Sequence, residues 1–153
     1  MTLKVALAGD HAGYEYKHEI INQLESDGLI TKDFGPYSAE SCDYPDYVHP
    51  LSESIEKNEY DLGIVICGSG NGVAMTANKH QGIRCALAWN TELAEVAKLH
   101  GDINVLSIPA RFVTLETAKE MVRAFIYTEF EGGRHEKRVN KIPIQSHNKE
   151  KGA

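Results

Sequence analysis

The chain has 153 residues, of which 42% are hydrophobic and 25% are charged, as is typical of one ordinary globular domain. This balance excludes an intrinsically disordered, collagen-like or coiled-coil chain. The 16 Lys and Arg residues against 22 Asp and Glu residues give a net charge of −6, which disfavours binding to nucleic acid or to anionic lipid.

The predicted elements alternate along the chain. Short apolar runs predict strands at residues 3–8, 29–34, 62–67, 84–87 and 104–107. Segments of helical period predict helices at residues 14–26, 47–57, 72–79, 91–100 and 115–127, with Thr114 as the N-cap of the last helix and Gly28 ending the first. Such alternation is typical of a parallel sheet covered by helices on both faces.

The first and third predicted strands are followed by residues that carry chemistry. Ligands of open parallel sheets bind at the carboxyl ends of strands, so we expect a site there. Asp10 and His11 follow the first strand. A carboxylate beside an imidazole could transfer protons or contact a phosphate, or Asp10 could only cap a helix.

Cys67 ends the third strand and precedes three glycines at alternate positions, Gly68, Gly70 and Gly72, with Ser69 and Asn71 between them. Such a loop can point several N–H groups at one anion, and a helix start behind it favours a thiolate. The alternative is a small buried thiol before an ordinary turn. The glycine spacing matches neither the dinucleotide fingerprint nor a P-loop, which disfavours a nucleotide cofactor.

A compact basic segment stands out near the C-terminus. Residues 134–141 carry a charge of +3, which leaves −9 on the other 145 residues. Arg134 and Arg138 lie four apart, so both guanidinium groups can reach one face of a helix and hold a phosphate. A solvated tail is the usual alternative for such a run. The pair Gly132 and Gly133 separates the segment from the acidic body.

Two further features border the predicted site. Tyr44 precedes Pro45, which is expected to keep it out of the helical region and project its ring from a loop. His100 ends a predicted helix, where a histidine is more often a capping or core residue than a catalyst. No two histidines have metal-ligand spacing, so no metal is predicted.

The three cysteines, Cys42, Cys67 and Cys85, are odd in number and lack C-x-x-C spacing, which argues against a disulfide framework or a zinc finger. Met1 is followed at once by a predicted strand instead of a signal peptide, and no apolar run is long enough to span a bilayer. We therefore expect a reduced, cytoplasmic compartment.

Together, the motifs at residues 9–13, 43–45, 67–72, 77–79, 82–84 and 131–135 closely resemble the family of ribose-5-phosphate isomerase B. This family also contains the galactose-6-phosphate and allose-6-phosphate isomerases. The resemblance extends from the first strand to about Val139. It implies one domain over residues 1–153, an αβα sandwich with a five-stranded parallel sheet of Rossmann-like or flavodoxin-like type, and a C-terminal helical tail.

The resemblance also implies an activity, the interconversion of ribose 5-phosphate and ribulose 5-phosphate through a cis-enediolate, without metal or organic cofactor. Cys67 resembles the catalytic base, Ser69 the proton-shuttling hydroxyl, and His100 with Asp10 the ring-opening pair. The residues that resemble substrate and phosphate ligands are Asp10, His11, Tyr44, Gly68, Ser69, Gly70, Asn71, Gly72, Gly101, Arg111, Arg134 and Arg138.

In this family two subunits build each site, which implies a homodimer, with a tetramer left open. His100, Arg111, Arg134 and Arg138 would come from the partner, onto which residues 132–141 would dock, while residues 142–153 form a tail. Val73 stands where a serine-containing subset has a glutamate base, which places the chain among the cysteine-base members. Gly101 replaces a common Asn, which leaves open whether the substrate has five or six carbons.

Two interpretations of other classes stay open at this point. A non-catalytic sensor of phosphorylated metabolites could use the same sheet and would bind without turnover. A hydrolase with Cys67 as nucleophile would need a base within hydrogen-bond reach and would form a covalent intermediate.

Overall fold

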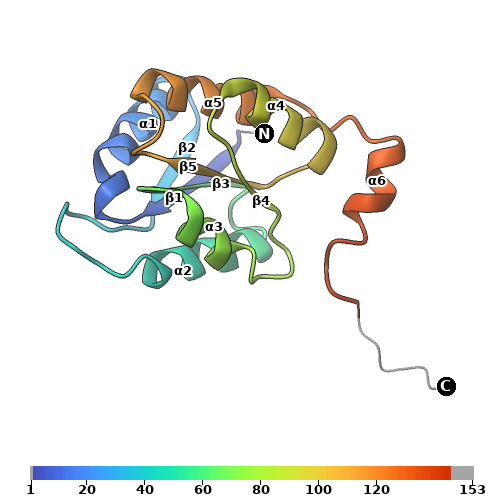
Figure 1. The fold of residues 1–153 in the computed structure, drawn as a ribbon, viewed down its shortest axis with the longest axis horizontal. Coiled ribbons are helices and arrows are strands. Elements are labelled where there is room, and N and C mark those ends of the chain that lie inside the picture. The colour runs from blue at the N-terminus through green and yellow to red at the C-terminus, as the bar shows by residue number, and fades with distance from the viewer. Residues whose placement is uncertain (1, 146–153) are drawn as a thin grey trace.

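The structure is a computed structural model that describes residues 2–145 of the chain. Five parallel strands form one sheet in the order β2-β1-β3-β5-β4 (Figure 1). The strands are β1 (Lys4–Gly9), β2 (Ile30–Asp33), β3 (Leu62–Cys67), β4 (Cys85–Leu87) and β5 (Val105–Pro109). Every residue of β3, the central strand, is buried, as expected for a strand covered on both faces.

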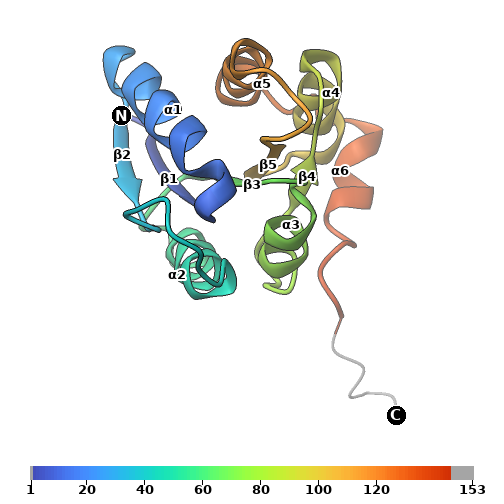
Figure 2. The ribbon, with the colours of Figure 1, turned by 60° about the vertical axis from the view of Figure 1, so that its left-hand side comes forward.

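Helices cover both faces of the sheet, which confirms the predicted three-layer αβα architecture. One face carries α1 (Tyr14–Ser26), α4 (Thr91–Gly101) and α5 (Leu115–Tyr127), and the other carries α2 (Pro45–Glu56) and α3 (Asn71–Ala77) (Figures 1 and 2). A short 3-10 helix, His11–Gly13, leads into α1. The last helix, α6 (Arg134–Val139), lies outside the sandwich beside α4.

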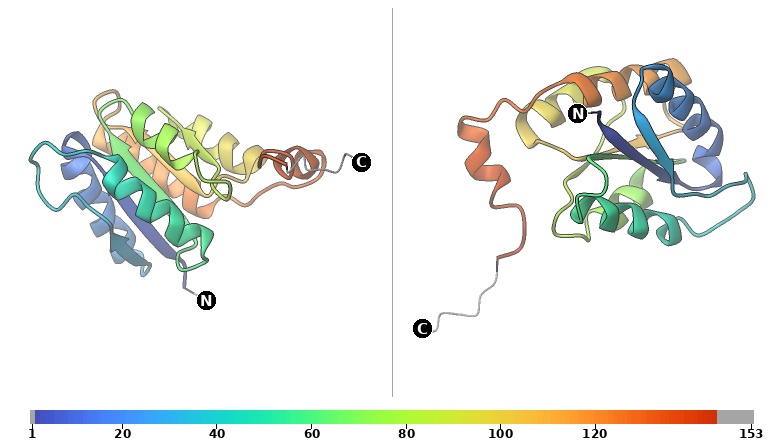
Figure 3. Two further views of the ribbon diagram at one scale, coloured as in Figure 1. Left: turned by 90° about the horizontal axis from the view of Figure 1, so that it is seen from below. Right: turned by 180° about the vertical axis from the view of Figure 1, so that it is seen from behind.

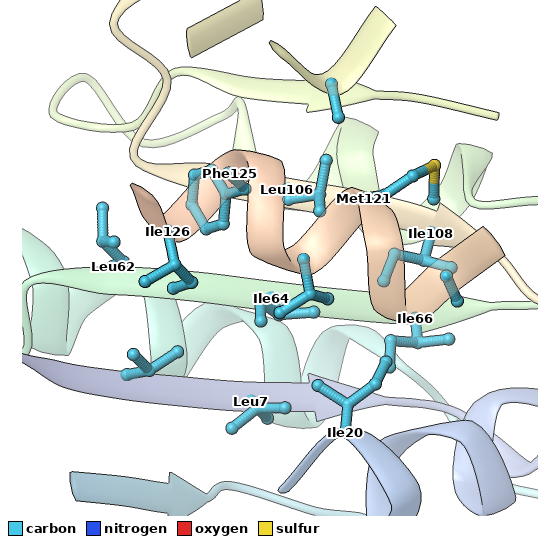
Figure 4. Close-up of a cluster of buried hydrophobic side chains, with 14 of the residues drawn as sticks. Leu7, Ile20, Leu62, Ile64, Ile66, Leu106, Ile108, Met121, Phe125 and Ile126 are labelled. Atoms are coloured by element: carbon cyan, nitrogen blue, oxygen red, sulfur yellow. The ribbon is translucent and has the colours of Figure 1, made fainter. Parts of the chain in front are cut away.

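Two hydrophobic clusters form because strand side chains alternate between the faces. Val5 and Leu7 of β1 join the larger cluster with α1 and α5, whereas Ala6 and Ala8 join the smaller one with α2 and α3. Figure 4 shows the larger cluster, in which Ile64 and Ile66 of β3 lie between the side chains of β1 and α5. The sheet is thereby fixed from both sides, and its carboxyl edge stays free to carry a site.

The predicted ends of the α1 and α5 helices are confirmed. The Thr114 side chain accepts a hydrogen bond from the Thr117 N–H at 3.1 Å and starts α5. Gly28 has a φ of +85°, the left-handed conformation that glycine adopts readily after a helix end. The buried stripe of α5 comprises the predicted Ala118, Met121, Val122, Phe125 and Ile126.

The prediction that Pro45 keeps Tyr44 out of the helical region is wrong. Tyr44 has φ −58° and ψ −32°, a helical conformation, and it is the N-cap of α2. Pro45 is tolerated because it occupies the first helical position, where its missing N–H would have no partner. The Tyr44 carbonyl accepts the Val48 N–H at 3.0 Å, which helps to offset the crowding before proline.

The connection to α6 turns at two glycines. Gly132 and Gly133 have φ values of +72° and +59°, and the Glu131 N–H just before them donates to the Leu99 carbonyl of α4 at 2.9 Å. Figure 3 shows α6 set apart from the sandwich. Within residues 2–145 no helix has the length and apolar character needed to cross a membrane. Residues 146–153 of the predicted tail lie outside the described residues.

Candidate active site

The site lies where β1 and β3 end side by side. The next strand in sequence, β2, lies on one side of β1, and β3 lies on the other. The strand order therefore reverses at β1, and α/β sheets bind their ligands at such a reversal. The turn after β1 packs directly on the β3 backbone. A Cβ atom at Gly9 would overlap the Ile66 carbonyl oxygen, and one at Gly13 would lie 2.5 Å from the same atom. Only glycine allows this close approach.

Asp10 caps the short helix after β1, as predicted. Its Oδ1 atom accepts hydrogen bonds from the N–H groups of Ala12 at 2.8 Å and Gly13 at 3.1 Å. Oδ2 takes no part in these bonds. The carboxylate is therefore held in one orientation while one of its oxygens stays available to a ligand.

Hydrogen bonds inside the glycine loop fix the Cys67 thiol. The Gly70 N–H donates to Cys67 Sγ at 3.2 Å, and the buried Ser107 hydroxyl donates to the Gly70 carbonyl at 2.7 Å. Gly70 has a φ of +75°, so the turn requires a left-handed residue. The Asn71 N–H donates to Ser69 Oγ at 3.2 Å.

A cleft of about 430 Å³ opens above this loop. It brings together seven of the predicted site residues: Asp10, Tyr44, Cys67, Gly68, Ser69, Gly72 and Arg111. The Tyr44 ring packs against Gly72, where any side chain would overlap it. Met75 and Phe112 also line the cleft and are 62% and 75% exposed. Sequence reasoning did not find these two, because no motif marks an exposed apolar side chain.

The expectation that Arg111 reaches the site from a partner chain is corrected by the structure. The Arg111 N–H donates to the Gly68 carbonyl of its own chain at 2.9 Å. Its guanidinium lies over Gly68, since a Cβ there would be 3.1 Å from Arg111 Nη1. The physical reason is that Arg111 follows β5, which ends beside β3 at the same edge of the sheet.

The segment that carries Tyr44 is tied to α1 through Lys17. The Lys17 side chain is fully buried and donates to Asp33 Oδ1 at 2.9 Å and to the Pro36 carbonyl. Burial lowers the Lys17 pKa, and the neighbouring Asp33 carboxylate partly opposes that shift. Lys17 thus ties α1 to the end of β2 and to the loop after it, a role that its position in a helix does not indicate.

His11 and Cys42 lie next to Asp10. His11 Nδ1 is buried and has no hydrogen-bond partner among the described residues. Burial raises the pKa of the Cys42 thiol, and the charges of Asp10 and Asp43 act in the same direction. The thiol of Cys42 therefore stays protonated more readily than a free thiol.

Four predicted site residues lie elsewhere in the chain: His100, Gly101, Arg134 and Arg138. Because α4 begins after β4 at the carboxyl edge and ends before β5 begins, His100 lies at the amino edge of the sheet. Cys67 lies at the carboxyl edge, and the six residues of β3 between the edges span roughly 20 Å. One chain therefore does not bring His100 to Cys67.

His100 instead lies in a cluster with Glu131 and His135. The His100 and His135 rings stack with centroids 4.2 Å apart and planes 9° apart. Glu131 Oε1 lies 3.6 Å from His100 Nε2 and 3.2 Å from His135 Nε2. Burial lowers the His135 pKa, and the positive charges nearby act in the same direction. Sequence spacing could not reveal this cluster, since His100 lies far from Glu131 and His135 along the chain.

The fold and the cleft define an α/β enzyme with a thiol, a carboxylate and an arginine facing a pocket for a small polar ligand. Residues 5–142 match the family model described as Ribose/Galactose Isomerase. The chain belongs to this family and is a sugar phosphate isomerase. Family membership favours an isomerase over the sensor and the hydrolase considered from the sequence.

Individual relatives agree over nearly the full length. Ribose-5-phosphate isomerase B of Escherichia coli is 40% identical over 139 residues, which cover 91% of this chain and 93% of the relative. The ribose 5-phosphate isomerase of Thermotoga maritima has a TM-score of 0.90 at 43% identity and 94% and 99% coverage. The Mycoplasma genitalium enzyme, solved with bound ribulose-5-phosphate, has a TM-score of 0.89 at 39% identity and 93% and 95% coverage.

Proposed function

We propose that the protein interconverts ribose 5-phosphate and ribulose 5-phosphate, as an enzyme of the pentose phosphate pathway, with Cys67 as the base. The observation that carries the proposal is the Cys67 thiol, held by the Gly70 N–H in a cleft that also contains Asp10 and Arg111. Bound ribulose-5-phosphate in the relative from Mycoplasma genitalium supports this choice of substrate.

The chemistry needs one proton to move between two carbons. In the aldose, the Cys67 thiolate removes the proton from C2 while a proton reaches O1, which gives the enediol. The thiol then returns its proton to C1 as the O2 proton leaves, which gives the ketose. Atoms and charge balance without a cofactor. Ser69 lies beside the thiol in the cleft and is suited to carry protons between O1 and O2.

The remaining ligands come from a second copy of the chain in this proposal. His100 would open the sugar ring, while Arg134 and Arg138 would hold the phosphate together with His11. Two observations support a homodimer: His100 lies at the opposite edge of the sheet from Cys67, and large exposed apolar side chains border the cleft. Those side chains are Met75, Trp89 and Phe112. A dimer is then the smallest active unit.

A C67A variant tests the role of the thiol. We expect ketose formation from ribose 5-phosphate to fall by roughly 10²–10⁴-fold, because the proton transfer loses its base. The matched control is C85A, which removes a thiol outside the cleft and should retain activity. Thermal unfolding of both variants verifies that they fold. Near-normal turnover by C67A would contradict the mechanism.

A six-carbon sugar phosphate is the second candidate, and Gly101 is the observation that favours it. A Cβ atom at Gly101 would meet only Ile103 Cγ2, at 3.7 Å, so the position has open space. The kcat/KM values for ribose 5-phosphate and allose 6-phosphate decide between the substrates, and we expect the higher value for ribose 5-phosphate. If Gly101 makes the room for the sixth carbon, G101N should lower kcat/KM for the six-carbon substrate selectively.

A further inference from the structure

The cluster of His100, Glu131 and His135 has the donor set of a transition-metal site. One potential ligand atom from each side chain lies within 4.8 Å of the other two. Two imidazoles and one carboxylate are the ligands of many zinc sites that keep a fourth position open. The cluster lies outside the Cys67 cleft of its own chain, at the opposite edge of the sheet.

The position of His135 supports binding. Its side chain is 12% exposed, and its Nε2 atom is buried, with Glu131 Oε1 3.2 Å away but outside hydrogen-bond geometry. The imidazole nitrogen carries a lone pair that can bind a metal ion, and such an ion would also satisfy this buried atom.

The backbone holds the three side chains on α4, on α6 and on the segment between α5 and α6. His100 lies in the last turn of α4, and the hydrogen bond from the Glu131 N–H to the Leu99 carbonyl fixes the next segment beside it. His135 lies in α6, and its Nε2 atom is 3.2 Å from Oε1 of Glu131, which precedes that helix. The ligands are thus close before any metal arrives, which reduces the entropic cost of binding.

We propose that His100, Glu131 and His135 bind one divalent transition-metal ion per chain, such as Zn²⁺, and that this ion inhibits the isomerase. The inhibition rests on the proposed function, because the ion would occupy the imidazole that opens the sugar ring. Binding itself does not depend on that function. The sugar and the ion would then compete for His100.

Two features oppose binding and are outweighed. Arg134 and Arg138 add positive charge, but both side chains are exposed and salt screens their repulsion. The stacked rings point their lone pairs side by side, so one ring must rotate before both lone pairs meet at one metal. His100 is 44% exposed and is free to make that rotation.

Titration of chelator-treated protein tests binding. Zn²⁺ is followed by calorimetry and Co²⁺ by visible absorption, and we expect one ion per chain with nitrogen and oxygen ligands only. H135A and E131Q should each weaken binding at least about tenfold. The matched control is H80A, since His80 Nε2 lies 2.7 Å from His49 Nδ1 in the other histidine pair. H80A should bind like the parent protein.

Three results would overturn the site: no saturable binding, unchanged affinity in both H135A and E131Q, or a thiolate-to-cobalt charge-transfer band that assigns the ion to a cysteine. If H80A lost affinity while H135A and E131Q did not, the ion would bind at His49 and His80, and the proposed site would be wrong.

Activity provides the second measurement. The Zn²⁺ concentration that halves the isomerase rate should equal the concentration that half-saturates the site. The rate should recover when a chelator is added. The E131Q variant should not be inhibited at these Zn²⁺ concentrations. Binding without inhibition would overturn the regulatory half of the proposal. If the parent protein turns over no sugar phosphate, the proposed function fails, while the calorimetric titration still decides whether the site exists.

Discussion

Cys67 and Cys85 show how surroundings decide what a thiol does. Cys67 ends the central strand β3, where the Gly70 N–H points at its sulfur and a cleft opens beside it. Cys85 begins the edge strand β4, and burial raises its pKa to about 12 from an ordinary value of 9.0. The first thiol is the proposed base, whereas the second stays protonated and unreactive at neutral pH.

The raised pKa of Cys85 predicts a loss of stability in alkali. Between pH 9.0 and about 12 the folded chain keeps a proton on Cys85 that the unfolded chain has released. The free energy of unfolding therefore falls as pH rises, by up to about 1.4 kcal/mol per pH unit from this group. In C85A this contribution is absent, so denaturant unfolding between pH 8.5 and roughly pH 10.5 should show a shallower decline. An equal decline in the two proteins would contradict the assignment.

Residue roles that depend on neighbours in sequence could be predicted, and those that depend on distant segments could not. Asp10 was correctly expected to cap a helix, because capping involves only the next few residues. Tyr44 was expected in a loop because Pro45 disfavours a helical residue before it, but the start of α2 overrides that local preference. The cluster of His100 with His135 was missed, since it depends on how α6 packs on α4.

At the scale of elements, β5 determines the shape of the loop between β3 and α3. Ser107 of β5 is fully buried and donates to the Gly70 carbonyl at 2.7 Å. Gly70 in turn directs its N–H at Cys67 Sγ. A hydroxyl on β5 thus fixes the loop that follows the neighbouring strand, β3.

An S107A variant tests this support. The Gly70 carbonyl would lose its buried donor, which should cost about 1–3 kcal/mol of stability and lower kcat/KM as the loop loosens. S52A is the matched control: Ser52 is also fully buried, but it donates to Val48 of its own helix, whose backbone persists without it. S52A should retain its kcat/KM. Equal kcat/KM values in S107A and the parent would show that the loop does not depend on Ser107.

Elements with a strong local pattern were predicted well. The ends of α5 match because a capping Thr114 and a continuous apolar stripe define it without help from other segments. The β5 strand extends two residues further than expected, to Pro109, because it pairs with Cys67 of β3. Strand order depends on pairing between distant segments, and the placement of β5 between β3 and β4 has no local pattern that could indicate it.

At the scale of the whole molecule, His100 and Cys67 lie at opposite edges of one sheet, so the proposed site, which contains both residues, requires two chains. Complementation follows from that geometry. C67A and H100A should each be inactive alone, but a heterodimer of the two contains one site with both native residues. An equal mixture that exchanges subunits at random should recover about a quarter of the parent activity.

The measurement is the isomerase rate after the two variants are unfolded together and refolded, compared with each variant treated alone. C67A that is unfolded and refolded alone, at the same total concentration, controls for activity regained without subunit exchange. Absence of recovery, with dimers verified by light scattering, would mean that both residues act within one chain and would overturn the shared site.

The contacts of Gly9 and Gly13 with the Ile66 carbonyl have a consequence for how this scaffold can change. These contacts hold the turn that carries Asp10 against the strand that carries Cys67, and no larger side chain fits at Gly9 or Gly13. Mutation can therefore not adjust the distance between the carboxylate and the thiol without breaking the fold. Substitutions that reshape the cleft are therefore expected at lining positions outside these contacts, such as Tyr44.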